Sequence, residues 1–312
     1  MRGSPLTIVV GFLLLLAVST GAGYSVGASV NGSGEDVAAT AGSTTSTTPS
    51  GAEPAPSTAP TTAAPTTTTT EPGPRRPTAA DPLRVVLAGD SVMAGLAPPL
   101  EAAIEADGTS QVRFVLTPSV LRDPLVRHKW NQELEGFNPE VIVMFVGTWE
   151  SEVLRTGTGA ASTDPTWRTE YEANVLDPWL QLITSRGASV IWIGNAAVSN
   201  DEANLAFSAL NEAYAELPSR WPTVTYLSSQ ETLNGPGGGF HDVISDADGT
   251  WIRTRQVDGL HLCPAGAALL AEQLLTELTS VWKATEAPGW QDGDWRAADV
   301  YPADGCPVPS LP

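Results

Sequence analysis

The sequence is short of basic residues and of histidine. Its 312 residues include 16 Lys and Arg against 35 Asp and Glu, which gives a formal net charge of −19, and only 3 His. No stretch concentrates positive charge, so binding to nucleic acid is not expected. Zinc sites need about four Cys or His ligands at close spacing. The sequence lacks such a set, and we predict neither a metal nor another cofactor.

Cysteine is nearly absent as well. The two residues, Cys263 and Cys306, make an even count, which in an exported protein favours a disulfide over two free thiols. The bridge would join the C-terminal residues to the loop that follows the segment DGLHL. Two unpaired thiols are the alternative, because the argument rests only on the expected compartment.

The N-terminal residues carry almost no charge. One Arg precedes the apolar run LTIVVGFLLLLAV, and the next charged residue is Glu35. A run of this length followed by small residues, here STGA, is typical of a signal peptide. The weakly apolar character continues to Val30, which is long enough for a membrane anchor. Residues 1–30 are therefore predicted to be a signal peptide or an anchor, and both place the rest of the chain outside the cytoplasm, secreted or held at the membrane.

Bulky apolar residues are scarce from residue 31 to 80, where Thr, Pro, Ala, Ser and Gly dominate. This composition cannot bury enough apolar surface to fold, so we predict a disordered linker that acts as a spacer or as a passive tail. Residues 81–285 have the mixed composition of a folded domain. Residues 286–312 are rich in Gly, Pro and Trp and are predicted to be a tail on the domain surface, held by the disulfide.

Short apolar runs alternate with amphipathic runs throughout the predicted domain. The runs predict strands at 84–87, 112–116, 141–146, 189–193 and 224–227, and helices at 94–106, 124–134, 171–185, 204–217 and 264–282. Strands that are apolar on both faces and alternate with helices indicate an α/β fold with a parallel sheet covered on both sides. In such sheets, functional side chains gather at the carboxyl ends of the strands.

A hydroxyl group follows the first predicted strand directly, in the segment GDS that ends at Ser91. A serine hydroxyl is a weak nucleophile unless a base lies within hydrogen-bond reach, and a histidine oriented by a carboxylate can supply that base. His128 lies in a polar helical stretch and His241 in a glycine-rich loop. His261 lies just before the last predicted helix, and Asp258 precedes it by three residues.

Asp258 and His261 belong to one short loop, so the carboxylate can orient the ring without help from a distant segment. The alternative is an Asp and a His that only cap the helix or face solvent. The combination of GDS after the first strand with DGLH before the last helix favours a catalytic triad of Ser91 as nucleophile, His261 as base and Asp258 as the orienting acid.

The segments GDSV and DGLH resemble the motifs of the SGNH/GDSL hydrolases, a family of serine esterases. The resemblance covers about residues 83–282 and implies a three-layer α/β/α fold with a flavodoxin-like, five-stranded parallel sheet. The segments VGTWES and DGLHLCPAGAALLAEQL are similar to extracytoplasmic SGNH domains that accompany membrane O-acyltransferases of cell-surface glycans.

This resemblance implies an exported enzyme that cleaves or transfers an ester-linked acyl group, with O-acetyl on a glycan as the expected case. Its expected ligand is an ester-bearing small molecule or an acylated glycan, and its expected partner is a membrane acyltransferase.

The sequence departs from the family at the oxyanion hole. The family supplies a Gly after the second strand and an Asn after the third, whereas here the second loop reads LTPSVLRD and Trp149 stands where the Asn is expected. The resemblance implies the backbone N–H of Ser91 as one donor, with Ser119 and Trp149 as candidates for the others. A weakened SGNH domain that binds glycans without hydrolysing them is therefore the alternative to an enzyme.

Overall fold

The computed structural model describes residues 75–117, 119–157, 165–235, 237–246 and 248–309. The predicted signal peptide or anchor and most of the predicted linker lie outside these ranges. In the described ranges, no helix has both the length and the apolar character needed to cross a membrane. Arg75 donates two hydrogen bonds of 2.9 Å to Glu140, so the folded part includes residues that precede the boundary predicted at residue 81.

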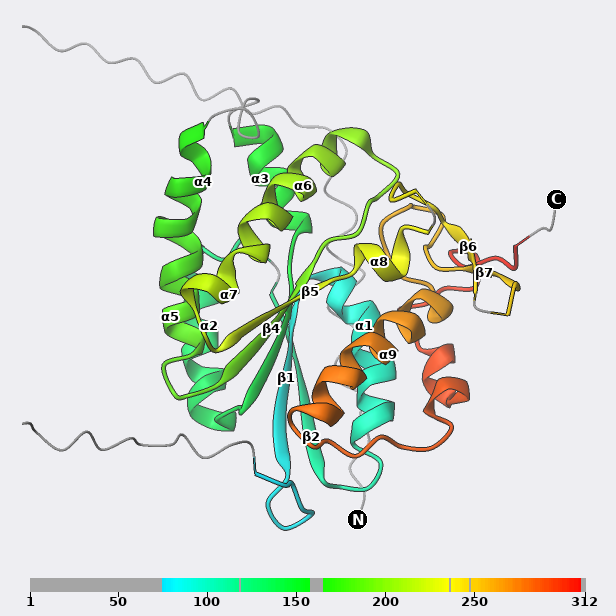
Figure 1. Ribbon diagram of the computed structural model, residues 1–312, viewed down its shortest axis with the longest axis horizontal. Coiled ribbons are helices and arrows are strands. Elements are labelled where there is room, and N and C mark those ends of the chain that lie inside the picture. Colours follow the sequence, from blue (N-terminus) through cyan, green and yellow to red (C-terminus); the bar gives the residue numbers. More distant parts are fainter. Residues whose placement is uncertain (1–74, 118, 158–164, 236, 247, 310–312) are drawn as a thin grey trace, which may run out of the picture. The chain divides into compact units, whose positions relative to one another are not determined.

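A parallel sheet of five strands forms the centre of the fold (Figure 1). The strands are β1 (Leu83–Gly89), β2 (Ser110–Leu116), β3 (Val141–Phe145), β4 (Ser189–Gly194) and β5 (Val224–Ser228). Their order is β2-β1-β3-β4-β5, which is the flavodoxin-like order of a doubly wound sheet. The predicted α/β/α fold is confirmed, and each strand lies where an apolar run predicted it.

Successive side chains of each strand point to opposite sides of the sheet, so each central strand contributes to a hydrophobic core on both faces. In β1, Val85 and Leu87 belong to one hydrophobic core, whereas Val86 and Ala88 belong to the other. The three central strands β1, β3 and β4 are buried at nearly every position and are continuous apolar runs, whereas the edge strands β2 and β5 also carry exposed polar residues.

Helices cover each face of the sheet (Figure 1). The first core is covered by α1 (Ser91–Ile104) and α9 (Pro264–Ser280), with the short helix α8 (Gln230–Leu233) beside them. The second core is covered by α2 (Pro124–Phe137), α5 (Asp177–Ile183) and α6 (Asp201–Ala215). The shorter elements near this second layer are α3 (Thr148–Gly157), α4 (Pro165–Tyr171), the π-helical turn η2 (Glu172–Leu176) and α7 (Leu217–Arg220).

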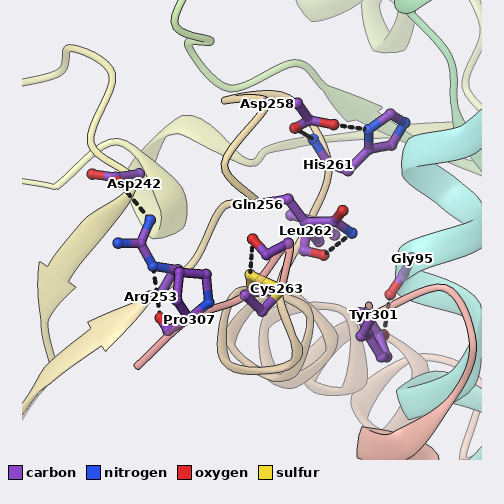
Figure 2. The surroundings of a disulfide bond; sticks show 12 residues. Gly95, Asp242, Arg253, Gln256, Asp258, His261, Leu262, Cys263, Tyr301 and Pro307 are labelled. Carbon is purple, nitrogen blue, oxygen red and sulfur yellow. Dashed lines mark hydrogen bonds and ion pairs between the residues drawn. A yellow bond between two sulfur atoms is a disulfide. The ribbon is translucent and has the colours of Figure 1, made fainter. Parts of the chain in front are cut away.

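The C-terminal residues are part of the hydrophobic core. Two 3₁₀ turns, η3 (Trp290–Asp292) and η4 (Asp294–Ala297), bury their tryptophans against the first core, and Tyr301 is buried beside them. The predicted disulfide between Cys263 and Cys306 is present (Figure 2). The predicted tail is thus integral to the domain, which extends beyond residue 285.

A small antiparallel hairpin precedes the loop that contains His261. Its strands are β6 (Val243–Ser245) and β7 (Trp251–Arg253), and Val243, Ile244 and Ser245 pair with Arg253, Ile252 and Trp251. Thr254 and Arg255 follow β7 and lead directly into the segment QVDGLH.

Candidate active site

Ser91 lies at the carboxyl end of β1, at the point where the strand meets α1. The turn is tight: a Cβ on Gly89 would lie 2.1 Å from the backbone oxygen of Phe145 on the neighbouring strand, so only glycine fits there. Asp90 is the N-cap of α1, and its carboxylate accepts a hydrogen bond from the N–H of Val92 at 3.0 Å. The cap starts the helix at Ser91 and holds the hydroxyl at the sheet edge.

The Asp90 carboxylate also joins β1 to β3. Its second oxygen accepts hydrogen bonds from the N–H groups of Gly147 at 3.3 Å and Thr148 at 2.9 Å. Burial raises the pKa of Asp90, against the opposing effect of the hydrogen bonds from Val92 and Thr148. The side-chain hydrogen bonds of Asp90 come from the backbone N–H groups of Val92, Gly147 and Thr148, so Asp90 organises the ends of two adjacent strands.

Asp258 and His261 hold each other within one turn. One carboxylate oxygen of Asp258 accepts hydrogen bonds from the backbone N–H groups of Leu260 at 2.9 Å and His261 at 3.0 Å. The other lies 2.6 Å from Nδ1 of His261 (Figure 2). Partial burial raises the pKa of Asp258, but the hydrogen bonds from the His261 ring and from these two N–H groups outweigh it and leave the pKa below its usual value. The carboxylate therefore stays ionised and orients the ring.

The structure brings the three candidate triad residues together. Nε2 of His261 lies 2.7 Å from Oγ of Ser91, although the two residues are 170 positions apart in the chain. Because Asp258 faces Nδ1, that nitrogen carries the proton in the favoured tautomer and Nε2 can accept the proton of the serine. Of the other histidines, His128 contacts Gln132 on the surface of α2, and His241 lies in the exposed loop before β6.

The C-terminal residues support the loop that carries Asp258 and His261. The Gln256 side chain donates hydrogen bonds of 3.0 Å to the carbonyl oxygens of Leu262 and Val300. The N–H of Val257 donates to the carbonyl oxygen of Gly305 at 2.9 Å, next to the disulfide. Figure 2 shows Gln256, Leu262 and Cys263 of the disulfide below the turn that holds Asp258 and His261.

The candidate oxyanion donors lie on different loops. The N–H of Ser91 belongs to the first turn of α1, where backbone N–H groups have no acceptor within the helix. Ser119 lies half-buried in the bend after β2, and Trp149 lies in the first turn of α3 with 47% of its surface exposed. No hydrogen bond between the described residues joins Ser119 or Trp149 to the triad. Their role as donors stays a prediction.

Two further polar residues at strand ends were not predicted. Asn195 follows β4 and is buried against Gly147, where a Cβ would lie 2.1 Å from its amide oxygen. Glu150, also buried, accepts a 2.6 Å hydrogen bond from the N–H of Leu121 and so links α3 to the loop after β2. Burial raises the pKa of Glu150. The position of Asn195 directly after β4 could have predicted it, whereas Glu150 lies inside α3, five residues beyond the end of β3.

An open cleft of about 460 Å³ adjoins the loop that carries Asp258 and His261. Ser199 lines it, and its backbone N–H and its hydroxyl donate hydrogen bonds to the carbonyl oxygens of Gly259 and Asp258 at 3.2 and 3.3 Å. Other lining residues are Ala196, Val198, Asn204, Phe207 and Phe240. Among the described residues, no group of three or more His, Cys, Asp or Glu is arranged to hold a metal ion.

A protein-family model matches residues 84–277, more than half of the chain, and its description is "Protein of unknown function (DUF459)". The chain belongs to the DUF459 family. The matched range runs from β1 into α9 and so includes all three residues of the candidate triad. A search of curated protein sequences finds no match to this DUF459 chain.

Solved structures similar to the DUF459 chain include several esterases. A Clostridium thermocellum family 3 carbohydrate esterase has 14% identity and a TM-score of 0.43, covering 64% of this chain and 97% of that chain. A catalytic mutant of Axe2, an acetylxylan esterase from Geobacillus stearothermophilus, has 13% identity and a TM-score of 0.44, covering 64% and 95%. A GDSL-like lipase from Bacteroides thetaiotaomicron has 13% identity and a TM-score of 0.42, covering 62% and 87%.

The sheet order and the positions of the GDS and DGLH segments in the DUF459 chain agree with the predicted SGNH/GDSL resemblance. At the identities and TM-scores of these solved structures, no activity follows from the similarity. The chemistry of the DUF459 chain has to be inferred from its own side chains.

Proposed function

We propose that this DUF459 protein is a serine-dependent carboxylic ester hydrolase or acyltransferase of the SGNH type. The observation that carries the proposal is the continuous series of hydrogen bonds from Ser91 through His261 to Asp258, at 2.7 and 2.6 Å, at the carboxyl end of β1. A nucleophile, a base and an orienting acid within these distances form the arrangement that activates a serine hydroxyl.

The reaction follows from this geometry. As Ser91 Oγ attacks the ester carbonyl carbon, Nε2 of His261 takes the hydroxyl proton, and the Asp258 carboxylate stabilises the imidazolium that forms. The tetrahedral oxyanion is stabilised by the N–H of Ser91, and its collapse breaks the ester bond while His261 returns the proton to the departing alcohol. Water then attacks the acyl-serine in a hydrolase, or a sugar hydroxyl does so in a transferase, with His261 again as the base.

An O-acylated glycan outside the cytoplasm is the substrate class that we propose. The disulfide between Cys263 and Cys306 is expected only in an oxidising compartment, which supports export of the chain. Trp149, exposed in the first turn of α3, offers an aromatic surface to a sugar ring. Attachment through residues 1–30 would place the domain beside a membrane acyltransferase, the partner implied by the motif resemblance.

Labelling of the serine tests the enzyme proposal. A fluorophosphonate probe is expected to modify the wild-type protein and not Ser91→Ala, and the same variant is expected to lose turnover of an aryl acetate while its circular dichroism stays unchanged. Ser245→Ala, altered in the exposed hairpin strand β6, is the matched control and should behave as the wild type. A wild-type protein that resists the probe, or a Ser91→Ala variant that keeps its activity, overturns the proposal and favours the glycan-binding module.

The glycan part of the proposal needs a separate measurement. Trp149→Ala is expected to lower kcat/KM for acetate release from an O-acetylated polysaccharide and to leave kcat/KM for the aryl acetate within about twofold, because only the polysaccharide offers a ring to stack. Equal effects on both substrates would assign Trp149 to the chemistry of the oxyanion hole instead.

A further inference from the structure

Arg255 is a buried cation beside the candidate triad. Only 3% of its surface is exposed, and it lies between the hairpin and the loop of His261. Its backbone N–H donates to the carbonyl oxygen of Asp242, and its backbone pairs with Leu262 in an isolated antiparallel bridge. The backbone is therefore anchored on two sides, and the position of the side chain is determined by the fold.

The guanidinium of Arg255 has unused hydrogen-bond donors. Among the described residues, none accepts a hydrogen bond from its Nε or its Nη1, and both atoms are buried. A buried charged donor without a partner is unfavourable, so native structures rarely keep one without a function for it. Burial lowers the pKa of Arg255 to about 10, which leaves the side chain protonated at neutral pH.

Asp258, the acid that interacts with this cation, does not neutralise it by hydrogen bonding. Asp258 attracts Arg255 electrostatically. Both of its oxygens, however, already accept hydrogen bonds from Leu260 and His261. Arg255 therefore presents a positive charge, with free N–H groups, next to the residues that would carry the reaction.

A small cavity lies in front of Arg255. It has room for about one water-sized group, and its two polar lining residues are Arg255 and Asn195. The remaining lining residues are apolar: Val92, Phe145, Ala196, Val198, Phe207, Leu260 and Leu262.

Chain neighbours of two triad residues line this cavity. Val92 follows Ser91 in the chain, and Leu260 and Leu262 flank His261. Ala196, Val198 and Phe207 line both this cavity and the open cleft of about 460 Å³, so the two spaces are neighbours.

We propose that Arg255 is an anion-binding residue of the substrate site, and that the preferred ester carries a carboxylate close to its scissile bond. The inference rests on the proposed esterase function and adds the charge of the substrate to it. A carboxylate suits the site because one of its oxygens is about the size of the group that the cavity can hold and can accept the N–H donors of Arg255. The rest of the anion would lie toward the open cleft, with which the cavity shares lining residues. The carboxylate can belong to the acyl group, as in the monoester of a dicarboxylic acid, or to the alcohol, as in an acetylated acidic sugar.

Matched pairs of substrates test the proposal and separate its two sources. For the acyl side, 4-nitrophenyl hemiglutarate is compared with 4-nitrophenyl pentanoate. For the alcohol side, 4-acetoxybenzoate is compared with 4-acetoxybenzamide. Ser91→Ala gives the background rate for each. We expect the anionic member of one pair to be preferred by about 10- to 100-fold in kcat/KM, the range for a hydrogen bond to a charged group.

Substitution of Arg255 should abolish this preference. Arg255→Met is expected to bring the ratio of the preferred pair to about one, and Arg255→Lys to keep part of it. Arg186→Met, which removes one positive charge from an exposed side chain, should leave the ratio unchanged. A wild-type ratio near one for both pairs, or a preference that survives in Arg255→Met, overturns the proposal. If Arg255→Met does not fold, Arg255→Lys replaces it as the test. A ratio in Arg255→Lys equal to that of the wild type then overturns the proposal.

A binding measurement keeps the site testable without catalysis. Calorimetric titration of Ser91→Ala with glutarate and with 4-hydroxybenzoate should detect binding of the one that matches the preferred source. The binding should disappear in the double variant Ser91→Ala, Arg255→Met. Absence of binding to both anions in Ser91→Ala refutes the anion site. An inactive wild-type enzyme that still binds one of them through Arg255 refutes only the esterase function.

Discussion

At the scale of single residues, the Asp258 carboxylate decides which nitrogen of His261 carries a proton, because it lies 2.6 Å from Nδ1. Asp258→Asn can present an N–H to that nitrogen and favour the opposite tautomer, in which Nε2 no longer accepts the proton of Ser91. By analogy with the best-studied serine protease triad, we expect kcat for an aryl acetate to fall by about 10³- to 10⁴-fold with the fold intact. A fall of less than tenfold would show that Asp258 does not control the tautomer.

Gly147 is a second residue whose identity follows from one contact. A Cβ at this position would lie 2.1 Å from the buried Asn195 amide, so Gly147→Ala has to displace Asn195 and the end of β3. We expect a loss of about 1–3 kcal/mol in the free energy of unfolding, measured by chemical denaturation. Gly136→Ala is the control, since nothing lies within 4 Å of a Cβ there, and a helical glycine replaced by alanine should gain about 0.5–1 kcal/mol. Equal effects of the two substitutions would contradict the steric argument.

At the scale of elements, α1 is unusual because Pro98 and Pro99 lie inside it. Pro99 has no N–H for the carbonyl oxygen of Gly95 one turn earlier, and the buried hydroxyl of Tyr301 donates to that oxygen instead. Tyr301→Phe should therefore cost about 1–3 kcal/mol of unfolding free energy. The substitution should cost clearly less in a Pro99→Ala background, where the helix supplies its own donor. Additive effects in this double-mutant cycle would exclude the compensation.

The last turn of α1 contains a pH-sensitive carboxyl group. Burial, together with the charge of Glu105 one turn away, raises the pKa of Glu101 to about 6. Since this value exceeds that of the unfolded chain, the folded state binds the proton more tightly, and the resulting stability is lost as pH rises from about 4.5 through 6. Glu101→Gln should leave the unfolding free energy unchanged at pH 4 and raise it at pH 7.5 by about 1 kcal/mol after solvent screening. A gain of the same size at both pH values would contradict this assignment to the Glu101 charge.

The elements also show what the sequence can and cannot predict. Hydrophobic runs located all five strands, because the central strands are buried on both faces and the edge strands keep several apolar residues in a row. Periodicity alone placed the start of α1 at residue 94, whereas the Asp90 cap begins it at Ser91. Helix α3 was not predicted: its segment TWESEVLRTG is mostly polar, and its contacts with α6 depend on the tertiary fold.

The candidate site likewise contains residues that the sequence predicts and a residue that it does not. Short motifs pointed to Ser91, Asp258 and His261, because chemistry of this kind needs particular residue types at strand ends and in one loop. Arg255 was missed because a charged side chain is usually exposed. Its burial results from the hairpin, the loop and the C-terminal residues folding together, which no local pattern reveals.

At the scale of the whole molecule, the disulfide connects the C-terminal residues to the loop that carries the triad. Cys263 and Cys306 are 43 residues apart, and a bridge of this span stabilises a fold by about 2–4 kcal/mol. Cys306→Ser should lower the unfolding free energy by this amount. It should lower esterase activity as well, even where the protein is fully folded, because the hydrogen bond from Val257 to Gly305 next to the bridge helps to hold the loop of Asp258 and His261.

Reductant provides the matched comparison for this prediction. Dithiothreitol should reduce both the melting temperature and kcat/KM of the wild-type protein and leave the double variant Cys263→Ser, Cys306→Ser unaffected. If the folded, reduced protein retained full activity, the loop would be held by its own hydrogen bonds and by the packing of Trp290 and Trp295 alone. The bridge would then stabilise the domain without contributing to the geometry of the triad.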